Sequence, residues 1–372
     1  MPEFKTYVST DVYMDFLNRQ KHYNITQTPM WAGVKNNWES CLCGLFDRGE
    51  MVGGAMALIY KLPANQKFIY VPRGYVLDYL NKDYLNEFTR GIKEYAEKIG
   101  AYMVRIDPEI ILSKMQNNIC EYDSFASEKM ENLKNCGHIH KGYAKDFRSY
   151  TQPRYNSVFP LADKDKRMYS DEEILLRLNK KIRKKIGVFT SARGIYFETD
   201  NTEEAVSVFA KIEKRTADRH NIMLRDENYF RRIYESFNDD VNLFFARMDL
   251  ERYIEFIKKG ENLILYETEF ALEDAERLRN EKGNILTLAG LLTVKSNDTA
   301  YVLYGGFDDS VFPKLSVNYQ LRYEALRFYR DMGLNCLCLL YTSPFPCPYQ
   351  LGLFYPRTLL SFSGVQLIRL RS

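Results

Sequence analysis

The 372-residue chain is 45% hydrophobic and 27% charged, an ordinary globular composition whose length suggests two domains. Lysine plus arginine (52) nearly balance aspartate plus glutamate (49), and a net charge of +3 excludes a bulk polycation that coats nucleic acid or membrane. Any basic site must therefore be local. The seven cysteines form no Cys-x-x-Cys pair, apolar runs such as residues 51–60 are too short to span a bilayer, and the N-terminus carries no export signal. We expect a cytoplasmic protein.

The first predicted elements are a hairpin, a third strand and a helix. From Gly44, two β-favouring runs flank a tight turn at residues 47–49, and residues 67–71 predict a further strand. A helix is predicted from about Asp78 to Ile99, followed by a strand over residues 102–106. The apolar face of the helix consists of Leu85, Phe88, Ile92 and Ala96, and Gly100 is its expected C-cap.

A basic segment follows in the middle of the chain. Ser170 and Glu173 form a capping box, and apolar residues at helical spacing predict a single helix that ends at Gly187. Its polar face carries the cations Lys180, Lys181, Arg183, Lys184 and Lys185. Such a concentration of charge indicates either a solvated helix face or a phosphate-binding patch.

The order of the first elements returns near the C-terminus. Strands are predicted over residues 289–294 and 300–304 with a turn between them, followed by a helix over residues 317–332. This order indicates either an internal duplication or a coincidence between common arrangements. Both interpretations predict an α+β protein with mixed sheets covered by helices.

Familiar catalytic motifs are absent from the sequence. There is no Gly-x-x-x-x-Gly-Lys-Ser/Thr loop, no Gly-x-Gly-x-x-Gly, no His-Glu-x-x-His and no Gly-x-Ser-x-Gly. Only four histidines occur, and His138 and His140 are better explained as a loop pair than as metal ligands. We assign no metal.

Six segments, taken in chain order, resemble one family. They are Tyr70-Val-Pro-Arg-Gly-Tyr-Val76, Val104-Arg-Ile-Asp-Pro108, Gln152-Pro-Arg-Tyr155 leading into Asn179-Lys-Lys-Ile-Arg-Lys-Lys-Ile186, residues 216–230, and Tyr301-Val-Leu-Tyr-Gly-Gly306. Together they resemble the FemABX family of non-ribosomal peptidyltransferases, from about residue 25 to about residue 335. Members move an amino acid from aminoacyl-tRNA onto a side-chain amine of the peptidoglycan stem peptide.

The resemblance implies two GNAT-like (acyl-CoA N-acyltransferase) domains. Domain 1 would be residues 1–150, completed by residues 364–372, and domain 2 would be residues 151–363. Members with a tRNA-contacting arm carry a long coiled-coil insertion in the second domain. Here the helical insertion near residues 251–282 is short and contains Gly260, so the chain resembles the FemX-like type with a short arm or none.

The resemblance also implies site residues. Lys35, Arg225, Tyr229 and Tyr304 match positions that grip a UDP-linked or lipid-linked muropeptide precursor. Arg225 and Tyr229 could equally be a surface pair at i and i+4 of a helix. Asp107 matches an acidic residue of the acceptor cleft, where it would act as general base or orient the amine. Its alternative is a turn-forming Asp-Pro.

The C-terminus departs from the family pattern. No acidic residue occurs from Gly333 to the end, and the family's catalytic lysine is replaced by Arg357 in a loose overlay. We hypothesise that the residues after about 337 are not native, a question that re-sequencing would answer. If so, the fold could persist while activity is lost.

The resemblance predicts an aminoacyltransferase of interpeptide-bridge synthesis. Its partners would be aminoacyl-tRNA, bound in part by the basic segment, and the muropeptide precursor, with peripheral contact at the inner membrane face. We expect a monomer that uses no cofactor, because the aminoacyl ester is already activated. Two alternatives stay open: a GNAT-type N-acyltransferase that uses acyl-CoA, although its pyrophosphate loop is absent, and a tRNA- or precursor-binding homologue without turnover.

Overall fold

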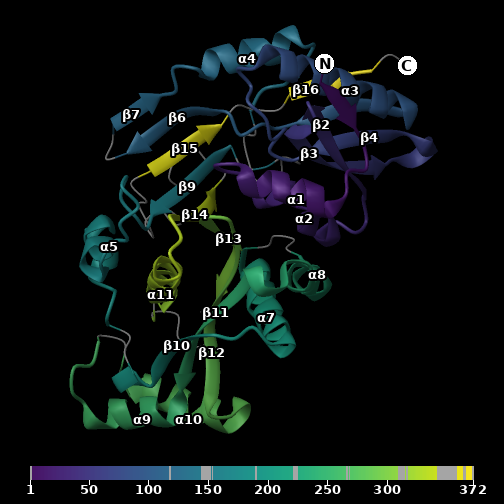
Figure 1. Cartoon of the computed structure of the whole chain (residues 1–372). Helices are drawn as coiled ribbons and strands as arrows, with labels where there is room; N and C mark the ends of the chain where they lie inside the picture. Colours follow the sequence, from purple (N-terminus) through teal and green to yellow (C-terminus); the bar gives the residue numbers. More distant parts are fainter. Residues whose placement is uncertain are drawn as a thin grey trace. The chain divides into compact units, whose positions relative to one another are not determined.

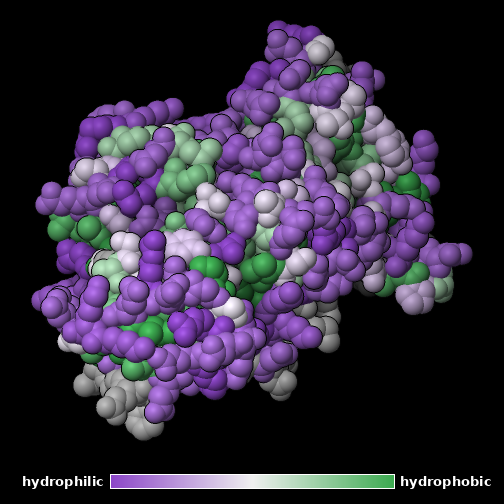
Figure 2. Space-filling view, turned by 90° about the horizontal axis from the view of Figure 1, so that it is seen from below, coloured by the Kyte–Doolittle hydropathy of each residue, from purple (hydrophilic) through white to green (hydrophobic). Residues whose placement is uncertain are grey.

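The structure, a computed structural model, describes residues 2–116, 119–143, 152, 154–188, 191–220, 225–264, 267, 269–308, 315, 317–341, 358–362 and 366–370. They form two units (Figure 1). Unit 1 runs from the N-terminus to Val158 and includes the described residues from Leu339 on, and unit 2 is Phe159–Cys338. None of the helices in these ranges combines the length and the apolar character that crossing a bilayer requires. On the face drawn in Figure 2, hydrophobic residues form small groups among hydrophilic ones.

Unit 1 contains a seven-stranded sheet. Its order is β1 (Glu3–Lys5), β2 (Glu39–Asp47), β3 (Glu50–Lys61), β4 (Lys67–Val71), β5 (Ala101–Ile106), β16 (Gln366–Arg369) and β8 (Ile139–His140). Arg48 and Gly49, with φ of 51° and 87°, form the two-residue turn that joins β2 to β3, and the predicted hairpin is confirmed. Strands β4 and β5 pair in parallel, and the other pairs are antiparallel.

Helices cover both faces of this sheet. A side chain at Gly54 would meet Phe16 of α1 (Thr10–Arg19), and one at Gly53 would meet Phe88 of α3 (Lys82–Lys98), so these two helices lie on opposite faces. Helix α3 begins later than predicted, because the side chain of Asn81 accepts a hydrogen bond from a backbone N–H of its first turn. The remaining helical elements are η1 (Ile25–Gln27), α2 (Pro29–Val34), η2 (Pro63–Asn65) and α4 (Ala126–Asn135).

A second group of strands in unit 1 joins distant parts of the sequence. Strand β15 (Thr358–Phe362) pairs with β9 (Tyr155–Pro160) on one side and with β6 (Ile111–Gln116) on the other, and β6 pairs with β7 (Ile119–Tyr122). The residues of β9 that pair with β15 are Tyr155–Val158. The chain after residue 357 thus supplies strands β15 and β16 to unit 1.

Unit 2 has the strand order β10 (Ile195–Thr199), β11 (Val241–Asp249), β12 (Ile285–Ser296), β13 (Thr299–Phe307) and β14 (Cys336–Tyr341), of which residues 336–338 belong to this unit. Helix α7 (Glu203–His220) and helix α11 (Val317–Asp331) lie on opposite faces, because a side chain at Gly306 would meet Ile212 of α7 and one at Gly305 would approach Arg322 of α11. The predicted hairpin and final helix are confirmed. The other helical elements are η3 (Ser191–Arg193), α8 (Glu227–Phe237), η4 (Asn238–Asp240), α9 (Leu250–Lys259) and α10 (Glu269–Lys282).

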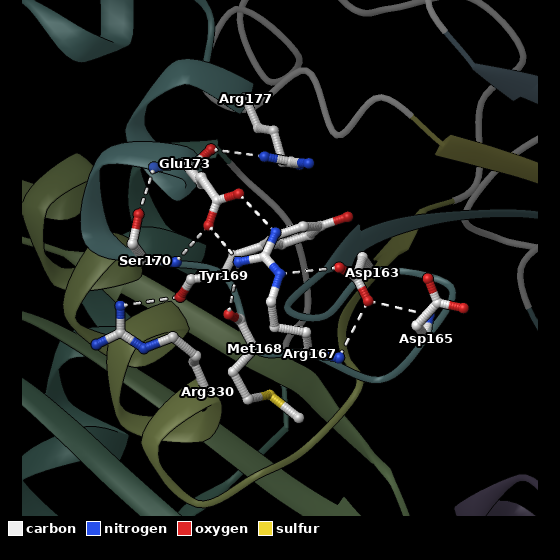
Figure 3. A network of polar contacts seen from close by, with 9 residues as sticks. All are labelled: Asp163, Asp165, Arg167, Met168, Tyr169, Ser170, Glu173, Arg177 and Arg330. Carbon is white, nitrogen blue, oxygen red and sulfur yellow. Dashed lines mark hydrogen bonds and ion pairs between the residues drawn. The ribbon is translucent and has the colours of Figure 1, made fainter.

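The predicted single helix from Ser170 to Gly187 is wrong. The capping box forms as expected and extends into a polar network, in which Arg167 binds the Glu173 carboxylate with an Nη2–Oε1 distance of 2.8 Å (Figure 3). However, α5 (Asp171–Arg177) ends before the extended Leu178, and α6 (Lys180–Arg183) begins after Asn179, whose ψ of 142° is not helical. The Asn179 side chain accepts a hydrogen bond from a backbone N–H of α6, which favours a new N-terminus over a continuous helix.

Helices α9 and α10 lie between β11 and β12 of unit 2, over the range where a short helical insertion is expected. The left-handed Gly260 ends α9. The segment between the helices is held by a buried ion pair in which the Arg193 guanidinium donates to Glu267 at 2.9 Å. This ion pair therefore links the segment between α9 and α10 to η3.

Candidate functional site

Asp107 lies directly after β5 and is 6% exposed. Its Oδ1 accepts a hydrogen bond from the Arg73 backbone N–H (2.7 Å), and its Oδ2 accepts from the Tyr70 hydroxyl (2.8 Å) and the Gln152 backbone N–H (2.7 Å). Burial raises the pKa of Asp107, and Arg73 and these donors offset part of the rise. Because both oxygens are occupied, the carboxylate holds three segments of unit 1 together.

A second, partly buried carboxylate, Glu109, lies two residues after Asp107 in the sequence. It accepts a hydrogen bond from Asn24 Nδ2 at 2.8 Å, and it lies 3.6 Å from His22 Nε2 and 3.7 Å from Arg73 Nε. Burial acts to raise the pKa of Glu109, but His22, Arg73 and Asn24 together lower it below its ordinary value. The Arg73 guanidinium therefore acts electrostatically on both acids, and its residue has a φ of 63°.

Lys35 lies at the C-cap of α2, also in unit 1. Its ammonium nitrogen is 5.4 Å from the ring centroid of Trp31, which is one turn earlier and buried. The aromatic face orients the lysine and attracts its positive charge.

In unit 2 the fold gathers Arg225, Tyr229 and Tyr304. The Arg225 guanidinium is 4.9 Å from the Tyr229 ring centroid, and its charge acts to lower the pKa of Tyr304. The hydroxyls of Tyr229 and Tyr304 are 3.4 Å apart. Arg225 precedes the first residue of α8, and Tyr229 is only 5% exposed, so the two are not a surface pair on one helix. Burial raises the pKa of both tyrosines, which keeps them protonated as hydrogen-bond donors.

A third acid, Glu213 of α7, lies near this cluster. Burial raises its pKa to about 7, and the Arg322 guanidinium opposes the rise. Glu213 also acts electrostatically on Tyr304. Sequence analysis missed this residue although a signal was present: Val206, Phe209 and Glu213 recur at helical spacing, which places a carboxylate on the apolar face of α7.

The cations of the basic segment are exposed or partly exposed. Lys180, Lys181 and Lys184 are exposed and Arg183 is partly exposed, and within the described ranges none of these four makes a salt bridge. Lys185 places its ammonium nitrogen 4.5 Å from the Tyr319 ring centroid. Ile182 is buried and anchors the short helix between them.

The remaining predicted residue, Arg357, lies outside the described residues. The described part of the chain contains no group of three or more His, Cys, Asp and Glu side chains that could hold a metal ion. Sequence analysis also missed Tyr70, Arg73 and Glu109 as site residues. Tyr70 and Arg73 stand within a segment that carried the family resemblance, but neither was distinguishable from strand and turn residues without the fold.

Comparison with known proteins identifies the family. A model of the FemAB family matches residues 8–270, which is most of the chain. The chain belongs to the FemAB family. A model of the acetyltransferase (GNAT) domain matches residues 278–349, so the GNAT fold predicted for this FemAB protein is confirmed.

Individual relatives agree with this assignment. The lipid II:glycine glycyltransferase of Staphylococcus aureus is 25% identical over 366 residues, covering 88% of this chain and 82% of the relative. Among solved structures, FemX superposes with a TM-score of 0.79 at 24% identity, covering 99% of this chain and 97% of FemX. A tandem GNAT protein from the clavulanic acid biosynthesis pathway superposes with a TM-score of 0.54 at 9% identity, covering 99% and 98%. The repeated element order is therefore a doubled GNAT fold, and the S. aureus relative of this FemAB protein is named as a transferase.

Proposed function

We propose that this protein transfers an amino acid from aminoacyl-tRNA to a side-chain amine of a peptidoglycan precursor. The Arg225–Tyr229–Tyr304 cluster carries the proposal, because the fold gathers three residues that the family resemblance assigns to precursor binding. The guanidinium suits the precursor's pyrophosphate, and the two phenols offer hydroxyls and aromatic faces. A relative whose name specifies lipid II favours a lipid-linked acceptor over a UDP-linked one.

The reaction is an aminolysis of an ester. The acceptor nitrogen attacks the ester carbonyl, a C–N bond forms, the bond to the ribose oxygen breaks, and that oxygen takes up the proton that the amine loses. The protein aligns the two groups and stabilises the oxyanion. In this proposal Lys35, Arg225, Tyr229 and Tyr304 bind the precursor, and Asp107 orients the acceptor amine or acts as its general base. Arg357 takes the role of the family's catalytic lysine.

The basic segment is the proposed contact for tRNA. Its exposed lysines can neutralise phosphates in a protein whose net charge is only +3. We place the reaction in the cytoplasm, with a monomer that meets its lipid-linked acceptor at the inner membrane face.

The test is transfer of radiolabel from a mixed pool of aminoacyl-tRNAs to a lysine-containing muropeptide in lipid-linked and UDP-linked form. We expect Arg225→Ala to lower kcat/KM by roughly 10- to 100-fold, the worth of a lost charge-assisted hydrogen bond. Arg19→Ala, an exposed arginine in the last turn of α1, is the control and should leave transfer unchanged. Absence of labelled muropeptide from every donor would refute the transferase proposal.

A second candidate is a binding protein without turnover. It is favoured by the departure of the C-terminal sequence from the family pattern, including Arg357 in place of lysine. Salt-sensitive tRNA binding, with no transfer even after a family-like C-terminus is restored, would establish it.

A further inference from the structure

Glu213 is a buried acid without a hydrogen-bond partner on one oxygen. It is 3% exposed, and its Oε1 is shielded from solvent and accepts no hydrogen bond from any residue that the structure describes. A side chain at Gly306 of β13 would begin only 3.0 Å from this oxygen and 2.6 Å from Thr216 Oγ1. The carboxylate and Thr216 therefore lie in the space that a side chain at position 306 would fill, and the strand offers Oε1 no side-chain donor there.

The surroundings of Glu213 connect it to the precursor cluster. Tyr304 lies two residues before Gly306 and so shares its face of β13. Arg322 of α11 approaches the same strand, because its Nη2 atom is 3.7 Å from where a Cβ at Gly305 would lie. It does not donate a hydrogen bond to Glu213 Oε1. The charged and titratable groups that act on Glu213 from the neighbouring elements are thus Arg322 and Tyr304.

We propose that Glu213 is an amine-binding residue of the transferase site, whose carboxylate accepts hydrogen bonds from the amino group of a substrate bound beside Tyr304. Burying a carboxylate without a partner is costly, and an ammonium group supplies the donors that the chain itself does not. This inference rests on the proposed function, in which both substrates carry an amine: the α-amine of the aminoacyl donor and the side-chain amine of the acceptor. The pKa of about 7 leaves Glu213 half protonated near neutrality, so an arriving ammonium ionises it.

The first experiment measures proton release on binding, by titration calorimetry at pH 7 in two buffers of different ionisation enthalpy. The ligands are a UDP-linked muropeptide and an amide-linked aminoacyl-adenosine, each also in a form whose amine is acetylated. We expect the full-length protein to release roughly half a proton with the ligand whose free amine reaches Glu213. That release should vanish with the acetylated form and in Glu213→Gln. Glu204→Gln, an exposed acid of the same helix, is the matched control.

The second experiment measures transfer. Glu213→Gln should lower kcat/KM by roughly 10- to 100-fold, and Glu213→Asp should recover part of the loss. A thermal melt of Glu213→Gln at pH 8 should show no loss of stability, which separates a binding role from a structural one.

The outcomes distinguish the two proposals. Normal transfer by Glu213→Gln, with proton release unchanged, overturns the amine site and leaves the transferase proposal intact. A wild-type protein that releases protons on binding but transfers nothing overturns the transferase proposal and leaves the amine site intact. Of the two ligands, the one whose acetylation abolishes the release identifies the source of the amine.

Discussion

Glu213 makes the stability of unit 2 depend on pH. Burial raises its pKa from 4.5 to about 7, so between these values the folded protein holds a proton that the unfolded chain has released. The stabilising effect of this proton is complete below about pH 4.5, declines as the pH rises towards 7, and is lost above it. We expect Glu213→Gln to be nearly neutral at pH 4.5 and to stabilise the protein by about 3 kcal/mol above pH 7. Urea unfolding at several pH values checks this, and a pH-independent difference between variant and wild type would contradict it.

Asp107 has a structural role that can be separated from catalysis. Replacement by asparagine puts an NH₂ group where an oxygen now accepts hydrogen bonds from Tyr70, Arg73 or Gln152. We expect Asp107→Asn to destabilise unit 1 by about 2–3 kcal/mol, because at least one buried donor loses its acceptor. Tyr70→Phe, which removes a single hydrogen bond, should cost about 1 kcal/mol. If Asp107 served only as a general base, Asp107→Asn would lose activity with an unchanged free energy of unfolding.

The break between α5 and α6 determines how the basic segment is displayed. The apolar spacing of Leu178 and Ile182 suited one continuous helix, and both residues are indeed buried. Local capping by Asn179 prevailed over that periodicity, and α6 is a single turn whose exposed lysines lie beside a buried Ile182. A pattern of apolar residues thus predicted which side chains are buried here, but not the path of the backbone between them.

The same segment gives a prediction for tRNA binding. Replacing Lys180, Lys181 and Lys184 together by alanine should weaken binding and reduce the slope of log affinity against log salt by about 2–3, because each lost phosphate contact contributes roughly 0.7–0.9. Filter binding at several salt concentrations measures the slope. The control replaces three exposed lysines of unit 1, Lys93, Lys98 and Lys141, and should leave the slope unchanged. Equal slopes in both triple variants would show that tRNA binds elsewhere.

Across the whole molecule, the sequence predicted the elements whose structure depends on residues close together in the chain. The hairpin at Arg48 and Gly49, the helix from Val317 and the repeated element order follow from turn residues and periodicity over short stretches. The insertion of β16 between β5 and β8 joins residues more than 200 positions apart and leaves no local pattern. The donors around Asp107 come from separate segments for the same reason, so the acid was predicted and its partners were not.

The last strand makes unit 1 depend on the end of the chain. Residues Gln366–Arg369 pair with β5, and the first two of them also pair with β8. Ile368 and Leu370 are only 4% and 6% exposed in the core of this unit. Each large buried side chain contributes about 2–5 kcal/mol, a substantial part of the roughly 5–15 kcal/mol that holds a domain folded. Truncation after Phe362 should therefore unfold unit 1 or lower its Tm by more than about 10 °C.

Tryptophan fluorescence reports this change specifically, because the two tryptophans of the chain, Trp31 and Trp38, both lie in unit 1. The control is truncation after Leu370, which keeps the whole of β16 and should melt like the full chain. Asp107 follows directly after Ile106, and Ile106 is the β5 residue that pairs with Gln366. Truncation after Phe362 should therefore also abolish amino-acid transfer. A truncated protein that kept the wild-type fluorescence transition would show that the first 158 residues fold without β16, and that the C-terminal strand stabilises unit 1 too little to control its site.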